Sequence, residues 1–362
     1  MKCKKKKTVV EPLKGLGKFD LVWNKTQNEL GWNIAIDLGT ERTKIVSKGV
    51  VLADEPSVVA YDMVHKRVVA VGKKALEMYE KTPKHISFVK PVQEGNIDDI
   101  KMTVEMLRGI IKTANAKRPL FWRPNRMVIC TPVGINKVEQ WAACKSGKKL
   151  GARTIKTIPY PIAVALGAGI DVNSPNANLI VVIGGGATDI ATISMGGIIS
   201  GTTLRIGGET FNDHIVDYLK RYHNLFIGCR VAEEMRNAIG AAVSVLEDEP
   251  AEYNAHGRDL LTGLANEVSI SFNEVAQAID HSVEIIVRKV LDTIYSLPPQ
   301  IVTDIAQTGI LLAGEGAHLR GLDKRIETAA RCKVRVIDNP SHAAARGAYI
   351  ALDNFNEYPF LT

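Results

Sequence analysis

The sequence predicts an α/β fold built from a repeated unit. A short apolar strand that runs directly into a glycine-containing turn occurs three times along the chain, and in two of these cases a second strand returns from the turn. Segments with the apolar spacing of amphipathic helices lie between the copies. Because alternating strands and helices are typical of α/β domains, and a recurring unit indicates duplication, we expect two related halves.

The strand-and-turn units define the expected sheets. Apolar runs of four to six residues that end at glycine-rich turns are typical of buried strands. The expected strands are 33–37 and 44–47 around a turn at 38–40, 179–183 and 190–194 around a turn at 184–186, and 310–313 ahead of a turn at 314–316.

Three segments are expected to be helical because their apolar residues recur every three or four positions. They cover residues 99–114, 137–150 and 273–291. Asn273 is the expected N-cap of the third helix, since its side chain can accept a hydrogen bond from the first turn. The two prolines at 298 and 299 are expected to end that helix.

Composition excludes several classes of protein. The chain has 362 residues, of which 46% are hydrophobic and 23% are charged, so disorder, collagen and coiled coil are excluded as the main architecture. The length suits two domains. The net charge is 46 − 39 = +7, but residues 1–32 alone carry 8 − 3 = +5. The basic character therefore belongs to an N-terminal extension, which by charge alone could bind anionic lipid, acidic protein or RNA.

Cysteine spacing and hydropathy suggest a reduced compartment. The five cysteines form no CxxC pair and no spacing suited to zinc, which fits a cytosolic protein. No apolar run near the start could act as a signal peptide, and none elsewhere is long enough to span a bilayer. Val9, Leu13, Leu16 and Trp23 approximate helical spacing, so the extension is either a solvated tail or a segment that folds on lipid.

The glycine turns could bind phosphate. Without Cβ atoms, the backbone N–H groups of such a turn can converge on phosphate oxygens, although a single glycine turn is more often only a tight hairpin. Asp37, at the end of the first strand, could organise the waters of a Mg²⁺ ion. The chain has neither a GxxxxGK[ST] nor a GxGxxG motif, so a nucleotide would have to bind between two glycine hairpins.

Several motifs taken together resemble the MreB family of bacterial actins over residues 33–352. They are Ile36-Asp37-Leu38-Gly39-Thr40, Ile183-Gly184-Gly185-Gly186, Gly207-Gly208, the segment 257–264 and Leu319-Arg320-Gly321-Leu322-Asp323. The resemblance implies an actin-like fold with two lobes around a central cleft that binds ATP or ADP with Mg²⁺. It implies a lobe I at 33–173 with a small insertion at about 54–88, a lobe II at 174–335 with an insertion at about 206–264, and a C-terminal helix and tail at 336–362 that return to lobe I.

The resemblance also assigns candidate nucleotide-binding residues. Asp37 is the candidate metal ligand, and Lys44 lies where actins often place a phosphate-binding lysine. The candidates are Asp37, Gly39, Thr40, Glu41, Arg42 and Lys44 in the first phosphate loop; Gly184, Gly185, Gly186, Ala187 and Thr188 in the second; Gly208 and Glu209; Glu233 and Arg236 around ribose and adenine; and Glu315, Gly316, Ala317 and His318 in the adenosine loop.

Departures from the family pattern predict weak or absent ATP hydrolysis. Tyr160 and Val182 stand where similar proteins carry carboxylates, one of which orients the attacking water. Ala187 replaces a threonine, and Glu315 replaces a glycine of the adenosine loop. Positioned acid–base groups contribute about 10²- to 10⁴-fold to such reactions, so we expect no intact catalytic residue set. Asp37 and Asp189 remain as groups that could support Mg²⁺.

The resemblance further implies membrane-associated filaments that determine cell shape. Leu120, Phe121 and Trp122 lie between arginines and prolines, in a segment similar to the family's membrane-inserting loop. Expected partners are further copies of the chain in paired filaments, MreB paralogues and an anionic membrane surface at the cytoplasmic face of the cell membrane, with no nucleic acid. The alternatives are a sugar-kinase-like enzyme of the same fold, an Hsp70-type ATPase and a plasmid-segregating actin.

Overall fold

The computed structural model describes residues 32–362 with the exception of 80, 115–123, 357 and 359. The predicted N-terminal extension therefore lies outside the described residues, apart from Trp32. This tryptophan is buried and is the first residue of a strand, which begins one residue before the predicted strand at 33–37.

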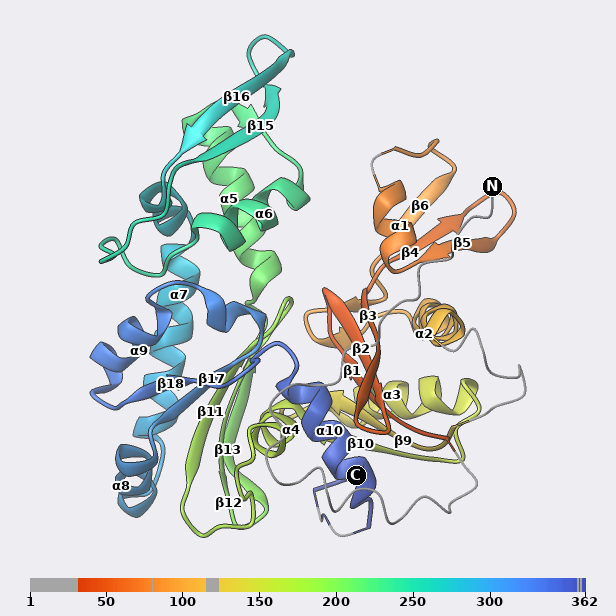
Figure 1. The fold of residues 1–362 in the computed structure, drawn as a ribbon, viewed down its shortest axis with the longest axis vertical. Helices are drawn as coiled ribbons and strands as arrows, with labels where there is room; N and C mark the ends of the chain where they lie inside the picture. Colours follow the sequence, from red (N-terminus) through yellow and green to blue (C-terminus); the bar gives the residue numbers. More distant parts are fainter. Residues whose placement is uncertain (1–31, 80, 115–123, 357, 359) are drawn as a thin grey trace, which may run out of the picture.

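Two five-stranded sheets form the centre of the molecule and share one topology (Figure 1). The first has the order β10-β9-β1-β2-β3 and the second has the order β18-β17-β11-β12-β13. In chain order, the first three strands of each sheet are antiparallel neighbours. The fourth strand pairs in parallel with the first, and the fifth pairs in parallel with the fourth. The strands are β1 (Trp32–Leu38), β2 (Arg42–Ser47), β3 (Val50–Pro56), β9 (Pro124–Thr131) and β10 (Thr154–Pro159), and β11 (Asn178–Ile183), β12 (Thr188–Ser194), β13 (Gly197–Leu204), β17 (Ile310–Ala313) and β18 (Val334–Val336).

This topology confirms the predicted α/β fold and its duplication. The predicted strands around both hairpin turns and ahead of the third turn are present. β11 and β17 are mostly apolar and buried at nearly every position, as strands of a sheet covered on both faces should be, and β12 is buried throughout although it carries polar residues. The glycine turns at 39–42 and 184–187 link equivalent strands of the two sheets.

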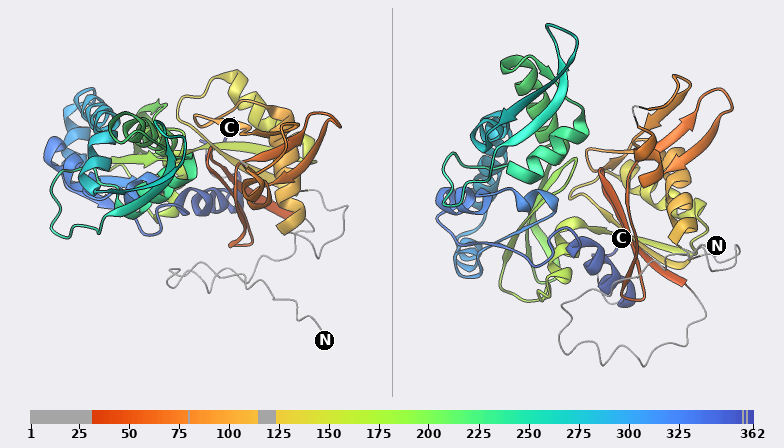
Figure 2. Two further views of the ribbon diagram at one scale, coloured as in Figure 1. Left: turned by 90° about the horizontal axis from the view of Figure 1, so that it is seen from above. Right: turned by 45° about the horizontal axis from the view of Figure 1, so that its top comes forward.

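Helices cover both sheets and lie between them. Those associated with the first sheet are α2 (Ile100–Ala114), α3 (Lys137–Lys149) and α4 (Tyr160–Gly167). Those associated with the second are α7 (Phe272–Tyr295), α8 (Pro299–Thr308), α9 (Leu322–Ala330) and the short helix η3 (Glu315–His318). The last helix, α10 (Ala343–Asp353), packs on α4 between the two sheets (Figures 1 and 2).

A smaller sheet extends from each half. β4 (Val59–Asp62), β5 (Arg67–Val71) and β6 (Ile86–Val89) pack with α1 (Lys73–Met78); β14 (Leu225–Phe226), β15 (Tyr253–Asp259) and β16 (Ala265–Ile270) pack with α5 (Gly208–Tyr222) and α6 (Cys229–Ile239). A two-stranded hairpin joins β7 (Val92–Gln93) to β8 (Asn96–Ile97). β6 ends one residue after the predicted insertion at about 54–88, and β16 begins one residue after the predicted insertion at about 206–264. The limits of both insertions stay predictions.

The predicted N-cap of the long helix α7 is wrong by two residues. Ser271, not Asn273, caps the helix: its hydroxyl accepts a hydrogen bond from the Glu274 backbone N–H, and the Glu274 carboxylate accepts one from the Ser271 backbone N–H. This reciprocal pair satisfies two N–H groups that would otherwise be orphaned, which Asn273 could not do from inside the helix. Phe272 is thereby placed in the core.

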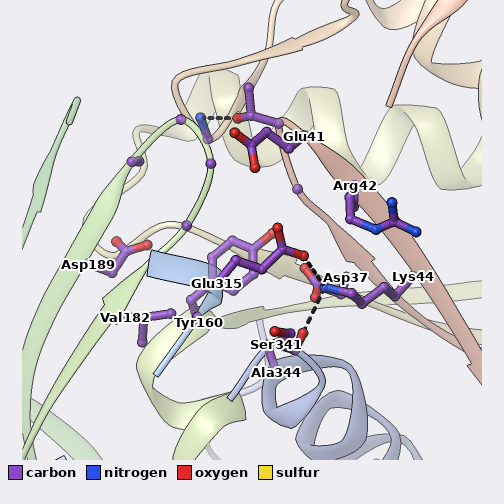
Figure 3. Close-up of a pocket in the computed structure, with 18 of the residues that line it drawn as sticks. Asp37, Glu41, Arg42, Lys44, Tyr160, Val182, Asp189, Glu315, Ser341 and Ala344 are labelled. Carbon is purple, nitrogen blue, oxygen red and sulfur yellow. Dashed lines mark hydrogen bonds and ion pairs between the residues drawn. The ribbon is translucent and has the colours of Figure 1, made fainter. Parts of the chain in front are cut away.

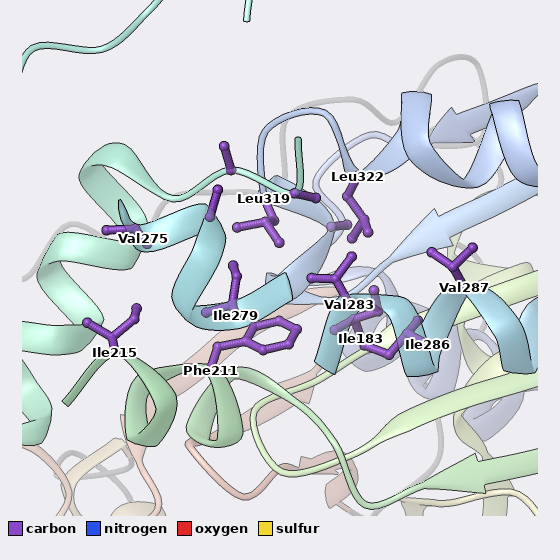
Figure 4. Close-up of a cluster of buried hydrophobic side chains, with 14 of the residues drawn as sticks. Ile183, Phe211, Ile215, Val275, Ile279, Val283, Ile286, Val287, Leu319 and Leu322 are labelled. Atoms are coloured by element: carbon purple, nitrogen blue, oxygen red, sulfur yellow. The ribbon is translucent and has the colours of Figure 1, made fainter. Parts of the chain in front are cut away.

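Helix α7 organises the core of the second half (Figure 4). Its residues Val275, Ile279, Val283 and Ile286 are buried along one face, opposite Phe211 of α5. The four residues recur at spacings of four, four and three, which keeps them on one side of a helix. No helix in the described part of the chain is long and apolar enough to cross a membrane.

Candidate functional site

The two glycine turns face each other across a pocket (Figure 3). Each turn is closed by the same backbone hydrogen bond, from Gly39 N to Arg42 O at 3.1 Å and from Gly184 N to Ala187 O at 2.9 Å. A Cβ atom on Gly186 would lie 2.5 Å from Oγ1 of Thr40, so the turns approach too closely for a side chain at that position. The close approach explains why the second turn is made of glycine.

The pocket between the turns is called the loop pocket here and encloses about 80 Å³. Eleven of the predicted nucleotide-binding residues line it, together with residues that sequence reasoning did not select as binding residues. The predicted ones are Asp37, Gly39, Thr40, Glu41, Arg42, Lys44, Gly184, Gly185, Gly186, Ala187 and Glu315; the others include Gly95, Tyr160, Val182, Asp189, Pro340 and Ser341.

A buried charge cluster lies at the base of the loop pocket. Lys44 Nζ donates to Glu315 Oε1 at 3.2 Å and to the backbone oxygen of Ser341 at 2.7 Å. Burial raises the pKa of Asp37, and the neighbouring Lys44 ammonium partly opposes this. Burial lowers the pKa of Lys44, but Asp37 and Glu315 outweigh it, so Lys44 stays charged. The cluster brings together strands β1 and β2, helix η3 and the segment before α10.

Tyr160 and Val182 lie in the pocket wall, and neither can act as a base. Tyr160 begins α4, and its hydroxyl lies beside Asp37 but has no hydrogen bond of acceptable geometry among the described residues. Burial, with the nearby Asp37 carboxyl, raises the Tyr160 pKa well above its usual range. Val182 pairs with Asp189 across β11 and β12.

Asp189 is held by residues from both halves of the molecule. Its Oδ1 accepts hydrogen bonds from the Val133 backbone N–H at 2.8 Å and from Thr203 Oγ1 at 2.5 Å. Burial raises the pKa of Asp189 to about 6, and these two hydrogen bonds oppose the shift. One oxygen of the carboxylate thus positions the loop after β9.

Arg42 is turned toward Asp54 rather than fully into the pocket. Its Nε lies 2.7 Å from Asp54 Oδ1, and His342 lies 3.5 Å from the other oxygen. Burial would raise the pKa of Asp54, but the hydrogen bonds from His342 and Arg42 outweigh it and hold this pKa well below its usual range. The structure therefore pairs this predicted phosphate-loop residue with a carboxylate.

A second cavity of about 330 Å³, the side pocket, adjoins the loop pocket at Glu315. It is lined by Phe211, Arg236, Asn237, Glu315, Gly316, His318 and Leu319. Four of the predicted adenosine-side residues are thus together. The remaining predicted residues, Thr188, Gly208, Glu209, Glu233 and Ala317, line neither cavity, while Leu120, Phe121 and Trp122 lie outside the described residues.

Two ion pairs join the halves beside the site, and sequence reasoning missed both. Lys90 Nζ lies 2.5 Å from Glu209 Oε1, and Arg205 Nη1 lies 2.9 Å from Glu94 Oε2. Gly95, in the turn between β7 and β8, donates its backbone N–H to Thr40 Oγ1 at 2.9 Å. Glu94 and Gly95 form this turn, and both adopt positive φ.

Comparison with known proteins identifies the family. The family described as MreB/Mbl protein matches residues 31–359. The chain is 37% identical to the cell shape-determining protein Mbl of Bacillus subtilis over 329 residues, covering 90% of this chain and 97% of the relative. It is 36% identical to the cell shape-determining protein MreB of Escherichia coli, covering 89% and 93%.

Solved structures agree with this family and with the fold. MreB 5 of Spiroplasma citri bound to AMPPNP superposes with a TM-score of 0.86 at 29% identity, covering 91% of this chain and 98% of that chain. A MamK double helical filament subunit superposes with a TM-score of 0.74 at 21% identity, over 91% and 99%, and supports the actin-like fold. On the family match and the identities to its members, the chain belongs to the MreB/Mbl family.

Proposed function

We propose that this protein binds ATP or ADP in the cleft between its two halves and polymerises into actin-like filaments that determine cell shape. The observation that carries the proposal is the pair of glycine turns, which come from equivalent strands of two sheets and face one pocket. Structures of Spiroplasma citri MreB5 with AMPPNP and with ADP, and the names of the curated relatives, support the same assignment.

Nucleotide binding can be tested at the second turn. Gly186→Val places a side chain against Thr40, so ADP affinity measured by calorimetry should fall at least tenfold. Gly197→Ala is the matched control, because a Cβ there would meet only Ser194 O at 3.9 Å, at the far end of β12. Equal loss of affinity in both variants, or no ADP binding by the wild-type chain, would contradict the proposal.

Mg²⁺ fits the site only together with phosphates and water. No three His, Cys, Asp or Glu side chains converge on a metal position within the described ranges. Mg²⁺ is commonly held by one or two carboxylates, substrate phosphates and several waters, so one buried carboxylate at the end of β1 is sufficient. Asp37 would be that ligand, and the ion would neutralise phosphate charge.

Hydrolysis is proposed to be weak. General-base help from a group whose pKa is near neutral is worth about 10²- to 10⁴-fold. Tyr160 is held neutral by its burial, and Val182 has no acid–base chemistry. Phosphate release measured beside an MreB that carries both carboxylates should therefore be at least a hundredfold slower; equal rates would contradict this part of the proposal.

The proposed surface for self-association lies at the far end of the second half. The hairpin of β15 and β16 projects from the molecule, and its turn exposes Leu261 at 79% and Leu264 at 70% (Figure 1). Neighbouring exposed leucines on a projecting hairpin suit burial against a second copy. Leu261→Asp with Leu264→Asp should abolish sedimentation of filaments, whereas Val245→Asp, at an exposed site on the same half, should not.

Membrane association at the cytoplasmic face is proposed from the sequence alone. Leu120, Phe121 and Trp122, flanked by arginines, suit a lipid interface. Replacing the three residues with serine should abolish co-sedimentation with anionic liposomes, and unchanged binding would refute the role. Electron microscopy on anionic lipid monolayers, with and without Mg²⁺ and ATP, tests filaments and membrane together; mixing with a paralogue tests copolymerisation.

A further inference from the structure

Glu41 crosses from the first glycine turn to the other half of the molecule. Its side chain packs against Gly185, where a Cβ atom would overlap it, and its Oε1 lies 3.0 Å from the position of a Cβ on Gly208. Figure 3 shows the carboxylate pointing into the loop pocket. Gly185 and Gly208 thus leave space for the Glu41 side chain between the two glycine turns, which are proposed to contact the phosphates.

The Glu41 carboxylate is buried without a donor. Both of its oxygens are inaccessible and have no hydrogen-bond partner among the described residues, and the same is true of Nη1 of Arg236. That nitrogen lies 4.0 Å from Glu41 Oε1, which is too long for a hydrogen bond. Buried polar atoms without partners are costly, so these groups on opposite sides of the cleft are suited to meet the polar groups of a ligand.

The charges around Glu41 are mostly negative. Glu233 and Arg236 face it from α6, Glu209 from the start of α5 and Glu315 from η3, while Lys90 is held by Glu209. Burial raises the Glu41 pKa to about 7; Arg236 opposes the shift, and the three glutamates add to it. The carboxyl group therefore changes charge close to neutral pH.

A phosphate chain would meet this carboxyl group directly. An ionised carboxylate repels a phosphate oxygen and can only accept hydrogen bonds, whereas a protonated one donates. We propose that Glu41 couples nucleotide binding to proton uptake: it takes one proton from solvent as the phosphates enter between the turns, and its O–H then donates to a phosphate oxygen. The inference rests on the proposed nucleotide binding and adds to it a residue that selects the charge state of the complex.

Proton uptake predicts the direction in which ADP affinity changes with pH. Above the free-state pKa, each further unit of pH should weaken ADP binding by up to about tenfold, because one proton must be supplied to the complex. Below it, Glu41 is already protonated and the dependence should disappear. The phosphate groups of ADP also titrate in this pH range. Proton uptake is therefore compared between the wild-type chain and a variant, because the phosphates contribute equally to both.

The test is calorimetric titration of the full chain with ADP and Mg²⁺ from pH 6 to 8.5, in buffers of different ionisation enthalpy. At pH 8 the wild-type chain should take up close to one proton more than Glu41→Gln, and the variant should bind ADP about tenfold more tightly. Glu234→Gln, an exposed residue of the same helix as Arg236, should behave as wild type.

The outcomes separate the two proposals. ADP binding with the same proton uptake in wild type and Glu41→Gln overturns the role of Glu41 and leaves nucleotide binding intact. No ADP binding by either protein at any pH overturns nucleotide binding and the coupling with it. If Glu41→Gln does not fold, as judged by circular dichroism, Glu41→Ala must show the same loss of proton uptake, and its failure to do so overturns the role.

Discussion

The two hairpins at the centre of the molecule share a backbone and differ in chemistry. Asp37 pairs with Lys44 across β1 and β2, and the equivalent pair across β11 and β12 is Val182 with Asp189. Both turns are four residues long and closed by the same hydrogen bond. One hairpin thus brings a carboxylate and an ammonium group into the pocket, while the other brings glycine backbone and the Asp189 carboxylate, with no cationic side chain.

The threonines next to the turns show how the shared backbone is kept. Thr43 and Thr188 occupy equivalent positions, and each hydroxyl bonds to the chain that follows the third strand of its sheet. Thr43 Oγ1 lies 2.8 Å from Ser57 Oγ, and Thr188 Oγ1 donates to the Ile206 backbone oxygen at 2.7 Å. Equivalent contacts therefore hold the duplicated architecture, while the cleft residues differ between the two hairpins. The two halves therefore share a backbone arrangement but contribute different chemical groups to the site.

The largest predicted effect is at the charged hairpin. Lys44→Met should lower the free energy of unfolding by about 3–5 kcal/mol, because Asp37 and Glu315 would lose a buried counter-charge. At the equivalent position of the other hairpin, Asp189→Asn should leave the free energy of unfolding unchanged or raise it at neutral pH, because it removes a buried carboxylate whose charged form is disfavoured by burial. Urea unfolding measures both, with exposed Lys74→Met as control. Equal costs at the two positions would contradict the proposed asymmetry.

The next effect concerns equivalent helices that meet between the halves. α4 and α10 each carry an Ala-x-x-x-Gly pattern, Ala163 with Gly167 and Ala343 with Gly347. A Cβ on Gly347 would overlap the Ala163 backbone oxygen, and one on Gly167 would overlap that of Ala343. Either Gly→Ala change should therefore destabilise by about 1–3 kcal/mol or more.

Thermal unfolding of Gly347→Ala and Gly167→Ala checks this prediction. Gly197→Ala in β13, where a Cβ would make only an ordinary contact with Ser194 O at 3.9 Å, is again the control. If the symmetry of the crossing is real, the two helix variants should be destabilised by similar amounts. A large effect of one and none of the other would show that the two helices are not equivalent at their contact.

A smaller, pH-dependent effect is expected at Asp189. Its pKa is about 6 in the folded protein and about 3.9 in an unfolded chain, so the folded state binds the proton more tightly. The resulting stabilisation is complete below about pH 4 and is lost as the pH rises to about 6, by about 2–3 kcal/mol. The difference in unfolding free energy between wild type and Asp189→Asn should follow this curve; a flat difference would contradict the buried carboxyl.

The smallest effect is expected at Tyr160. Its hydroxyl has no hydrogen bond of good geometry in the described structure, so Tyr160→Phe should be neutral or should stabilise by up to about 1 kcal/mol. Phosphate release should not change, because a neutral phenol does not serve as the base. A drop in turnover would show that the hydroxyl orients water and would revise the proposed loss of catalytic groups.

Much of the fold could be predicted because its signals are local. Apolar runs that end at glycine turns predicted β1, β11 and β17, and helical spacing predicted α2, α3 and α7 to within a few residues. The N-cap of α7 was wrong, although Glu274 three residues after Ser271 is a local capping signal that could have corrected it. The candidate nucleotide-binding residues came from the family resemblance, which gave no distances or contacts between them.

The contacts that decide the site's chemistry join residues far apart in the chain. The sequence by itself determined the strand-and-turn units, their repetition and the absence of the expected carboxylates at Tyr160 and Val182, since these depend on neighbouring residues or on identity alone. Only the tertiary structure paired Lys44 with Glu315 and brought Glu41 to Arg236. Charge, burial and pKa depend on what lies within a few ångströms in space, and periodicity along a chain does not specify those neighbours.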